Sequence, residues 1–448
     1  MNPNKVIIAP DSYKGALTAR EATDIIADEV TRAFPGCEII KMPIADGGEG
    51  SVDAVLSAIG GKVMTETVLS PDFRQIEATY GIADNGMAII EMAQSSGITR
   101  QLKLNPMTSN TYGFGELILA ALNKGVRAFT LCIGGSATTD GGCGMAAALG
   151  VKFFRKTGVK QGDGSEHGDG SEKGERQDNV SVPVPHRPKQ DNVPVPVSHR
   201  CDKPFTPCGE TLRYIESIDI SGIDKRIAES VFTVMCDVDN PLYGERGAAY
   251  VYGPQKGADP GQIQILDEGL RHYGAVLQKT FNRSFKDKIG GQNKEPVPMS
   301  SNVNFSDVPG AGAAGGLGAG CMAFLDAKLK SGIDTILELY SFSEQAKDAD
   351  LVITGEGKLD SQSFQGKILS GILRGSENVP IITICGACDC DPVLLKEKDI
   401  TVFEASEGVT VKESMEEPEK YLRIAAERAM RYIINETDEP SNNIAKDK

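Results

Sequence analysis

Five loops that carry acidic or hydroxyl side chains, four of them together with glycine, recur along this 448-residue chain. They cover residues 9–15, 45–50, 134–142, 236–240 and 354–360. Four of them directly follow an apolar, strand-like run, and the second follows a weaker run. In α/β proteins ligands bind outside the carboxyl ends of the strands, where glycine lets N–H groups approach an anion and carboxylates hold Mg²⁺ or accept a proton. The pattern therefore predicts a site for a phosphorylated ligand and a metal ion.

Strand-like and helix-like patterns alternate at both ends of the chain. The first strand is expected at 6–10, and Thr18 and Glu21 form a capping-box sequence that begins a helix reaching residue 34. Further strands are expected at 38–42, 351–354, 381–385 and 400–403. This alternation is typical of an α/β fold with a parallel sheet covered by helices. Residues 63–91 instead hold short β segments without long helices, which indicates a second, mixed or antiparallel sheet.

The change of pattern predicts one domain inserted into another. Residues 1–64 and 308–436 are expected to form one α/β domain, and residues 65–307 the inserted domain. Nearly identical repeats rich in Gly, Ser and Pro occupy 158–207. Such a composition does not bury enough apolar surface to offset the entropy of ordering. We therefore expect a disordered insert at 158–207 and a disordered polar tail at 437–448.

Composition limits the partners of the chain. The net charge is −15 and there is no dense Lys/Arg run, which argues against nucleic acid and anionic membrane surfaces as partners. No apolar run approaches the roughly 20 residues that span a bilayer, and the N-terminal stretch lacks the features of a signal peptide. The ten cysteines, several of them within apolar runs, indicate reduced thiols. We expect a cytoplasmic protein, and the sequence leaves its oligomeric state open.

The first two loops carry candidate ligands for an anion and a metal. Lys14 lies between a strand end and a capped helix, beside Asp11 and Ser12, where it can bind a phosphate together with the helix N-terminus. A solvated loop lysine is the alternative. Asp46 and Glu49 lie in a turn that holds more glycines than a plain turn needs, which favours contacts to a metal or a hydroxyl.

The 134–142 loop is the best phosphate-loop candidate in the middle of the chain. It joins an apolar strand to a helix, and its N–H groups can surround oxyanions together with Gly135, Ser136, Thr138 and Thr139. It is not a Walker A loop, and no Gly-x4-Gly-Lys-Ser/Thr motif occurs in the chain. A P-loop kinase is therefore not expected.

A pair of aspartates follows the strand-like run that ends near residue 235. Alternation along the chain puts Asp237 and Asp239 on one side, spaced for a shared metal ion or for work as a general base. An Asx-turn is the alternative. Asn240 precedes Pro241, so part of this turn is structural in either case.

The last loop places Glu356 and Asp360 after an apolar strand, as candidate contacts to a substrate or a metal. Lys367, at the start of the next helix, can reach the same cleft, and we weigh this role evenly against a structural one. Residues 310–315 match the dinucleotide pattern G-x-G-x-x-G, but the preceding run is too polar for the strand that this fingerprint requires. Close helix packing explains these glycines better.

Two other functions stay as alternatives for the whole chain: a nicotinamide-dependent hydroxy-acid dehydrogenase and a non-catalytic ligand-binding regulator.

Seven motifs together resemble one family. They are I-A-P-D-S-Y-K-G, A-D-G-G-E-G, I-G-G-S-A-T-T-D-G-G, C-D-V-D-N-P-L, G-P-Q-K-G, P-G-A-G-A-A-G-G-L-G and I-T-G-E-G-K-L-D, beginning at residues 8, 45, 133, 236, 253, 309 and 353. In this order, over about residues 5–430, they resemble the type I bacterial glycerate kinases. A set of ordered motifs is far more specific than any single one.

The resemblance implies ATP-dependent phosphorylation of D-glycerate with Mg²⁺, giving 2-phosphoglycerate. A 3-phosphate product or another small hydroxy-acid kinase stays open. It also implies a Rossmann-like domain with a second α/β domain inserted, and the motifs, spread over both, place the active site in the cleft between them. Residue chemistry makes Asp237 the first choice as base, ahead of Asp46. Lys14, Lys256 and Lys367 are candidate cations for the glycerate carboxylate or the transferring phosphate.

Overall fold

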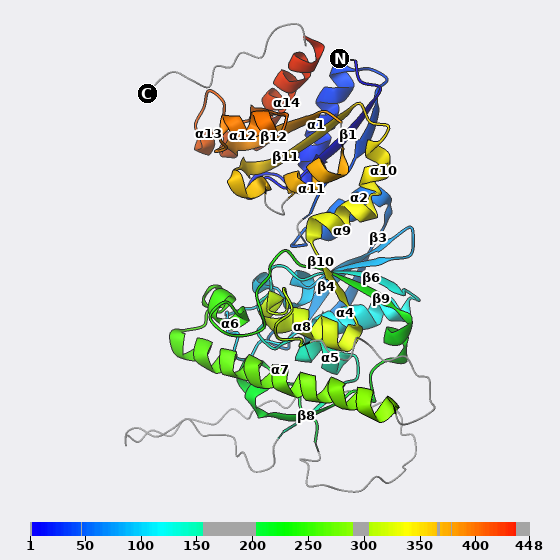
Figure 1. The fold of residues 1–448 in the computed structure, drawn as a ribbon, viewed down its shortest axis with the longest axis vertical. Coiled ribbons are helices and arrows are strands. Elements are labelled where there is room, and N and C mark those ends of the chain that lie inside the picture. The colour runs from blue at the N-terminus through cyan, green and yellow to red at the C-terminus, as the bar shows by residue number, and fades with distance from the viewer. Residues whose placement is uncertain are drawn as a thin grey trace.

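The computed structural model describes residues 2–45, 47–155, 203–289, 304–364, 368–377 and 379–435. These residues form two bodies stacked along the longest axis of the molecule (Figure 1). The upper body contains β1 near the N-terminus and α14 (Pro418–Ile434), and the long helix α7 (Pro260–Ile289) crosses the lower body. The α/β architecture with two sheets that the sequence predicts is confirmed.

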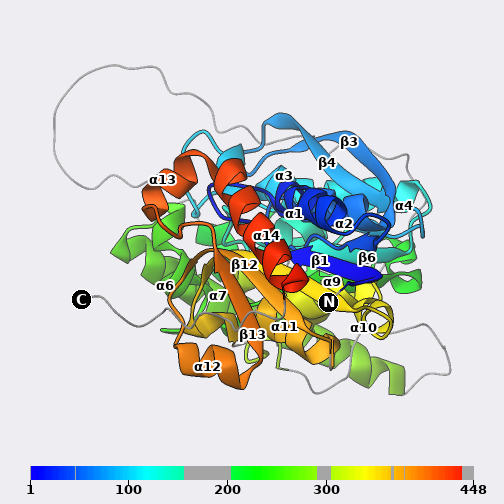
Figure 2. The same cartoon turned by 90° about the horizontal axis from the view of Figure 1, so that it is seen from above.

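The upper body is built on a five-stranded parallel sheet in the order β13–β12–β11–β1–β2. Its strands are β1 (Lys5–Pro10), β2 (Glu38–Lys41), β11 (Leu351–Leu359), β12 (Ile381–Cys388) and β13 (Ile400–Glu404). Helices α1 (Ala19–Ala33) and α14 pack together on one face, as the view from above shows (Figure 2). The other face is covered by α2 (Ser51–Ile59), α9 (Gly332–Leu339), α10 (Phe342–Ala346) and α11 (Ile368–Gly375).

The order of this sheet reverses between β1 and β11. From β1 the chain continues to β2 on one side, whereas β11 is followed by β12 and β13 on the other. Helix α1 begins as predicted, because Thr18 Oγ1 accepts the N–H of Glu21 at 3.2 Å and the Glu21 carboxylate accepts the N–H of Thr18 at 2.8 Å. A reversal of strand order leaves a crevice at the carboxyl ends of the strands, and ligands bind in such crevices.

The lower body holds a mixed sheet in the order β10–β9–β6–β5–β4–β3. Its strands are β3 (Gly61–Leu69), β4 (Gln75–Ala83), β5 (Ala88–Glu91), β6 (Ala128–Cys132), β9 (Val231–Met235) and β10 (Lys328–Lys330). Neighbours are antiparallel from β3 to β5 and parallel from β5 to β10. Smaller elements complete the fold: α3 (Ala93–Ser96), β7 (Lys152–Arg155), β8 (Ile215–Asp219), α6 (Ala248–Tyr252), α12 (Pro392–Glu397) and α13 (Val411–Glu416).

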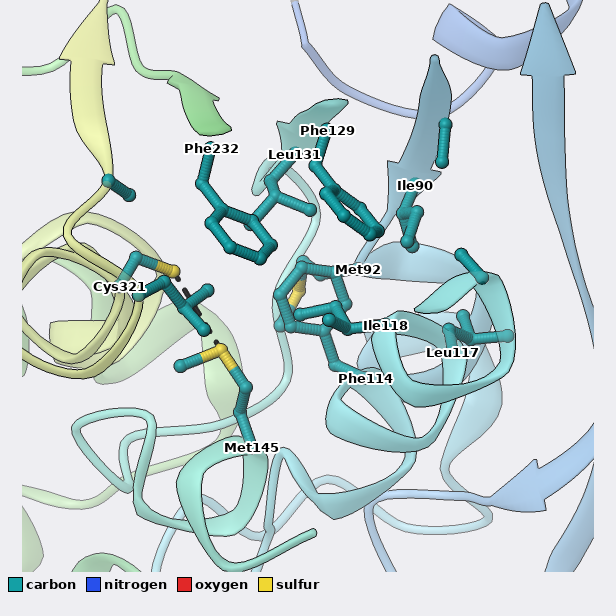
Figure 3. Close-up of a cluster of buried hydrophobic side chains, with 14 of the residues drawn as sticks. Ile90, Met92, Phe114, Leu117, Ile118, Phe129, Leu131, Met145, Phe232 and Cys321 are labelled. Carbon is teal, nitrogen blue, oxygen red and sulfur yellow. Dashed lines mark hydrogen bonds between the residues drawn. The ribbon is translucent and has the colours of Figure 1, made fainter. Parts of the chain in front are cut away.

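The core of the lower body lies between this sheet and the helices α4 (Tyr112–Asn123), α5 (Cys143–Ala148) and α8 (Ala313–Leu325) (Figure 3). Phe129 of β6 and Phe232 of β9 stack with their ring centroids 4.6 Å apart. The Cys321 thiol of α8 faces the Met145 sulfur of α5 at 3.9 Å. Strands and helices far apart in the sequence therefore share one apolar core.

The 355–360 motif differs from its expected form, because most of it continues strand β11. Strand β12 also runs beyond its expected end, and the two pair as far as Leu359 and Cys388. A Cβ on Gly355 would collide with the carbonyl of Ile384, and one on Gly386 would collide with the carbonyl of Gly357. These glycines therefore mark the close approach of two strands as well as a site.

Two expected boundaries also differ from the structure. Helix α7 continues to Ile289, although the polar composition of residues 284–306 predicts a loop there. Helix α8 and strand β10 pack with the lower sheet, although the sequence placed 308–436 in the first domain. Local pattern does not reveal which sheet a three-residue strand will join. We propose that the chain returns to the upper body after β10.

Several predictions fall outside the described residues. They concern Asp46, Lys367, the tail 437–448 and the repeat insert 158–207 except for its last residues. The cysteines of the described segments are free thiols. Among the helices of those segments, none has the length and apolar character needed to cross a bilayer.

Truncation of the stacked phenylalanine pair tests this core. Phe232→Ala removes a buried ring, and we expect it to lower the free energy of unfolding by about 3–5 kcal/mol. Val231→Ala is the matched control, because Val231 lies next to it on the same strand and is 65% exposed. The measurement is urea denaturation followed by circular dichroism. Equal losses in the two variants would contradict the packing shown in Figure 3.

Candidate active site

A cavity of about 1180 Å³ lies between the two bodies. Its walls come from the segments that follow β1, β11 and β12 of the upper sheet and β6 and β9 of the lower sheet. Both sheets thus turn the carboxyl ends of parallel strands toward one cleft. The residues selected from the sequence that line it are Asp11, Ser12, Lys14, Gly135, Ser136, Asp237, Lys256, Glu356 and Asp360.

The turn after β1 brings Lys14 to the rim of this cavity. Tyr13 and Leu17 exchange two backbone hydrogen bonds, of 2.8 and 3.0 Å, so the exposed Lys14 and Gly15 form the tip of the turn. The buried hydroxyl of Tyr13 donates to the carbonyl of Ile384 at 2.5 Å, which anchors the turn to β12. Because α1 begins directly after this turn, a cation and helix N–H groups can meet one anion here.

The end of β11 forms the wall beside the turn. Glu356, Lys358 and Asp360 all line the cavity, and the N–H of Asp11 donates to the carbonyl of the glycine before Glu356 at 2.7 Å. The sequence selection omitted Lys358, which forms an exposed ion pair of 3.2 Å with Asp389. The upper wall therefore offers two lysines and three carboxylates on neighbouring strand ends.

The loop after β6 is held from two sides. The N–H of Gly134 donates to the carbonyl of Gly47 in the upper body at 3.1 Å, and the N–H of Gly141 donates to the carbonyl of Gly315 at 3.1 Å. Gly135 has a φ of 73°, a conformation that favours glycine. A Cβ on Gly315 would collide with the carbonyl of Thr138, so the start of α8 lies directly against the loop.

Lys256 is the buried cation of this site. Its side chain is 1% exposed, and its ammonium group donates to Ser136 Oγ at 2.8 Å and to the carbonyl of Thr138 at 2.6 Å. Burial lowers the pKa of Lys256 to about 7, and the charge of Asp140 opposes that shift. A lysine with this environment changes its charge near neutral pH, which is typical of functional sites.

Asp140 supports the loop from beneath, and the sequence selection missed it. Its carboxylate accepts the N–H and the hydroxyl of Thr111 at 2.9 and 2.7 Å, and the N–H groups of Gly142 and Gly144 at 3.2 and 3.0 Å. Burial raises the pKa of Asp140, and these hydrogen bonds oppose the shift. The only signal in the sequence is a carboxylate enclosed by glycines and threonines.

Two predicted ligands of this loop lie below its surface. Thr138 and Thr139 are fully buried, and their hydroxyls lack hydrogen-bond partners within the described part of the chain. Ser136, by contrast, lines the cavity. The structure thus presents Ser136 and the loop backbone toward the cleft, and Thr138 acts on Lys256 through its carbonyl.

The segment after β9 separates its two aspartates. Asp237 lines the cavity, and its Oδ1 accepts the N–H of Gly332 at the start of α9 at 2.8 Å. Asp239 instead forms an exposed ion pair of 3.0 Å with Arg246 and does not contribute to the described cavity wall. Asn240 accepts a hydrogen bond from the hydroxyl of Tyr252, a cavity-lining residue that the sequence selection omitted, at 2.5 Å.

The 45–50 loop approaches the same region from the upper body. Glu49 is exposed and lies outside the described cavity wall, whereas Ala45 contributes to it. Glu91, which was not selected, is buried and accepts the N–H of Val52 in the first turn of α2 at 2.7 Å. Burial raises the pKa of Glu91, opposed by this hydrogen bond. Glu91 thus ties the start of α2 to the lower sheet.

The described residues do not form a dedicated metal cage. Among them, no group of three or more His, Cys, Asp or Glu side chains can hold a metal ion. The 310–315 segment also lacks the strand of a dinucleotide fingerprint, since residues 304–312 form turns. Its glycines pack against the lower body instead.

Comparison with known proteins gives the family of this chain. The family model of the glycerate kinase family matches residues 6–173 and 195–434. This chain belongs to the glycerate kinase family. Relatives include a glycerate kinase of Halalkalibacterium halodurans, 38% identical, and a glycerate 2-kinase of Escherichia coli K12, 37% identical, with 86% of each chain covered in both pairs.

A solved structure of this family shares the fold. A crystal structure of a protein assigned as glycerate kinase 2 from Salmonella typhimurium LT2 superposes with a TM-score of 0.74 at 31% sequence identity. The match covers 97% of this chain and 100% of that one. The chain is thus a kinase-family enzyme with the two-sheet α/β architecture described above.

The buried state of Lys256 leads to a prediction about pH. The ordinary pKa of lysine is 10.5, and in the folded protein it is about 7, so between these values only the unfolded chain carries this proton. Unfolding therefore takes up a proton in this window, and the Lys256 contribution to stability rises with pH by up to about 1.4 kcal/mol per pH unit. Below pH 7 both states are protonated and the contribution is constant.

To test this pH dependence, the natural protein is compared with Lys256→Met, which lacks the titrating ammonium group. The free energy of unfolding of the natural protein minus that of the variant should increase between about pH 7 and pH 10. Urea denaturation at a series of pH values measures both, and other titrating groups cancel in the difference. A difference that stays constant over this range would contradict a lowered pKa of Lys256.

Proposed function

We propose that this chain transfers the terminal phosphoryl group of ATP to the 2-hydroxyl of D-glycerate. The observation that carries the proposal is the shared cleft: the loops of both bodies bring Lys14, Lys256 and Asp237 to one cavity in a chain of the glycerate kinase family. The name of the Escherichia coli relative, glycerate 2-kinase, supports the 2-position. We expect a cytoplasmic enzyme that acts on a small molecule and requires neither nucleic acid nor membrane.

In this proposal Asp237 is the general base. As the substrate hydroxyl oxygen bonds to the terminal phosphorus, the bond from that phosphorus to the bridging oxygen of ADP breaks, and the hydroxyl proton passes to the Asp237 carboxylate. The hydrogen bond from Gly332 to Oδ1 holds the carboxylate at the cavity wall.

Positive charge and N–H groups supply the remaining catalysis. Lys14 at its turn and Lys256 beneath Ser136 lie on opposite bodies and neutralise anions from two sides. Mg²⁺, when bound with the nucleotide, withdraws charge from the phosphates. Glu356 and Asp360 are the described carboxylates that we propose for contact with it. Asp46 and Asp239 stay as sequence-based candidates, and Asp237, also a sequence-based metal candidate, acts in this proposal as the base instead.

The first test is turnover itself. Purified protein with Mg-ATP should release ADP only when D-glycerate is added, and phosphorus NMR should show the 2-phosphate. A 3-phosphate product would move the transfer to the other hydroxyl and overturn the assignment of position. Absence of ADP release with D-glycerate, in protein shown to be folded, would contradict the function.

The second test concerns Asp237. Asp237→Asn keeps an oxygen that can accept the N–H of Gly332, so we expect the fold to be kept while kcat falls by about 10²–10⁴-fold. Asp219→Asn is the matched control, because Asp219, at the end of β8 in the two-stranded β7–β8 sheet, accepts the N–H of Ser221 at 2.9 Å and does not line the described cavity. Steady-state kinetics measures both. Near-normal kcat in Asp237→Asn would remove Asp237 as the base.

A further inference from the structure

One end of the cavity in the upper body is apolar. Two of its lining residues, Val411 and Met415 on α13, are 50% and 49% exposed. Leu17, Ala405 and Leu422 line the same part of the cavity. Large apolar side chains gathered within a concave surface mark a ligand-binding site, whereas single exposed ones need no explanation.

This apolar end adjoins the turn that carries Lys14. The terminal methyl of Met415 lies 3.8 Å from the position that a Cβ on Gly15 would take. Below it, Gly386 and Ala387 of β12 line the cavity with almost no side chain. The Lys14 turn thus adjoins the apolar end, and Lys358 of β11 lines the same cavity. A ligand that occupies both parts needs an apolar portion followed by an anionic one.

Of the two substrates of the proposed reaction, only the nucleotide has both an apolar portion and an anionic portion. Every carbon of glycerate carries oxygen, so an apolar surface offers it little, and its carboxylate needs a cation. A purine nucleotide has a flat base with apolar faces, joined through the ribose to an anionic chain. A cavity of about 1180 Å³ also exceeds what a three-carbon acid requires.

We propose that the purine base of the nucleotide binds at the α13 end, against Val411 and Met415. The phosphate chain then passes Lys14 toward the lower body. The hydroxy acid binds at the opposite end of the cavity, near Ser136, Lys256 and Asp237. This inference rests on the proposed function and assigns the two substrates to different ends of one cleft.

The opposite assignment, with the hydroxy acid at the α13 end and the purine base near Lys256, agrees less well with the positions of the charged side chains. The cavity-lining residues of 405–422 include no lysine or arginine, so a hydroxy acid at the apolar end would depend on the adjoining Lys14 turn to pair its carboxylate. The lower body supplies Lys256, whose ammonium group already holds Ser136 at the cavity wall. The end of the cavity at the lower body is therefore better suited to the carboxylate of the hydroxy acid than the apolar end.

The test measures binding without turnover. Isothermal titration calorimetry with ADP, adenosine and inorganic pyrophosphate compares the natural protein with Met415→Asp. Loss of the sulfur contact and introduction of a charge should weaken ADP and adenosine by about tenfold or more and weaken pyrophosphate clearly less, since the new carboxylate also lies near the Lys14 turn. Met415→Leu should keep ADP affinity near that of the natural protein. The matched control is Val393→Asp, which places the same charge at a 62% exposed valine on α12, outside the described cavity wall.

The outcomes separate this inference from the proposed function. If the natural protein binds ADP but Met415→Asp binds ADP as tightly, or weakens pyrophosphate equally, the base does not lie against α13. If Met415→Asp leaves ADP binding intact and raises the KM for D-glycerate, the two substrates occupy the reverse ends. If the natural protein does not bind ADP or phosphorylate D-glycerate, the proposed function itself is contradicted.

Discussion

The cleft depends on a backbone contact between the two bodies. The N–H of Gly134, after β6, donates to the carbonyl of Gly47 in the upper body at 3.1 Å. A Cβ on Gly134 would lie 2.9 Å from the Cα of Gly48, and a Cβ on Gly47 would lie 2.9 Å from the Cβ of Met235 at the end of β9. Neither position has room for a side chain. These glycines therefore set how closely the strand ends of the two sheets face one another, and thus which residues can act on one ligand.

In the lower wall of the cavity, burial disfavours the charged forms of two ionisable side chains, while nearby charge and hydrogen bonds favour them. Asp140 and Lys256 lie close enough for the charge of one to affect the pKa of the other, and burial moves both toward their neutral forms. Four hydrogen bonds compensate Asp140, whereas Lys256 donates two within the described contacts and faces the cavity. A stable core does not need a buried lysine, since burial of an ammonium group is unfavourable. Retention of Lys256 is therefore easier to understand as a requirement of ligand binding than of folding.

The sequence predicted the elements better than their assembly. The strand at 6–10 and the capping box of Thr18 and Glu21 follow from local sequence patterns, and the structure confirms them. The sheet that accepts β10 depends on contacts with β9, far away in the sequence, and no local pattern encodes such a choice. The extension of strand β11 through Gly355 could not be predicted from the sequence for another reason. Glycine indicates a loop in the sequence, whereas here it permits two strands to approach closely.

The same distinction applies to the site. Nine residues selected from the sequence line the cavity, and most of them end or follow a strand, because the carboxyl ends of parallel strands meet by geometry. Thr138 and Thr139 look alike in sequence to Ser136, yet only Ser136 lines the cavity, because the loop turns at Gly135 with a positive φ and the threonines face inward. Asp140 and Tyr13 were passed over since their roles, support of a loop and of a turn, exist only in three dimensions.

The division of the cleft between two bodies bears on how the enzyme would favour transfer of the phosphoryl group to glycerate over its hydrolysis by water. If the nucleotide binds mainly to the upper body and the hydroxy acid mainly to the lower body, neither substrate alone completes the site. The phosphoryl group then meets its acceptor only where the Lys14 turn and the Ser136 loop come together. Water, which makes few contacts with either body, gains little from that arrangement, whereas glycerate brings a carboxylate that can pair with Lys256. Discrimination against hydrolysis would then follow from where the two sheets place their strand ends rather than from any single residue.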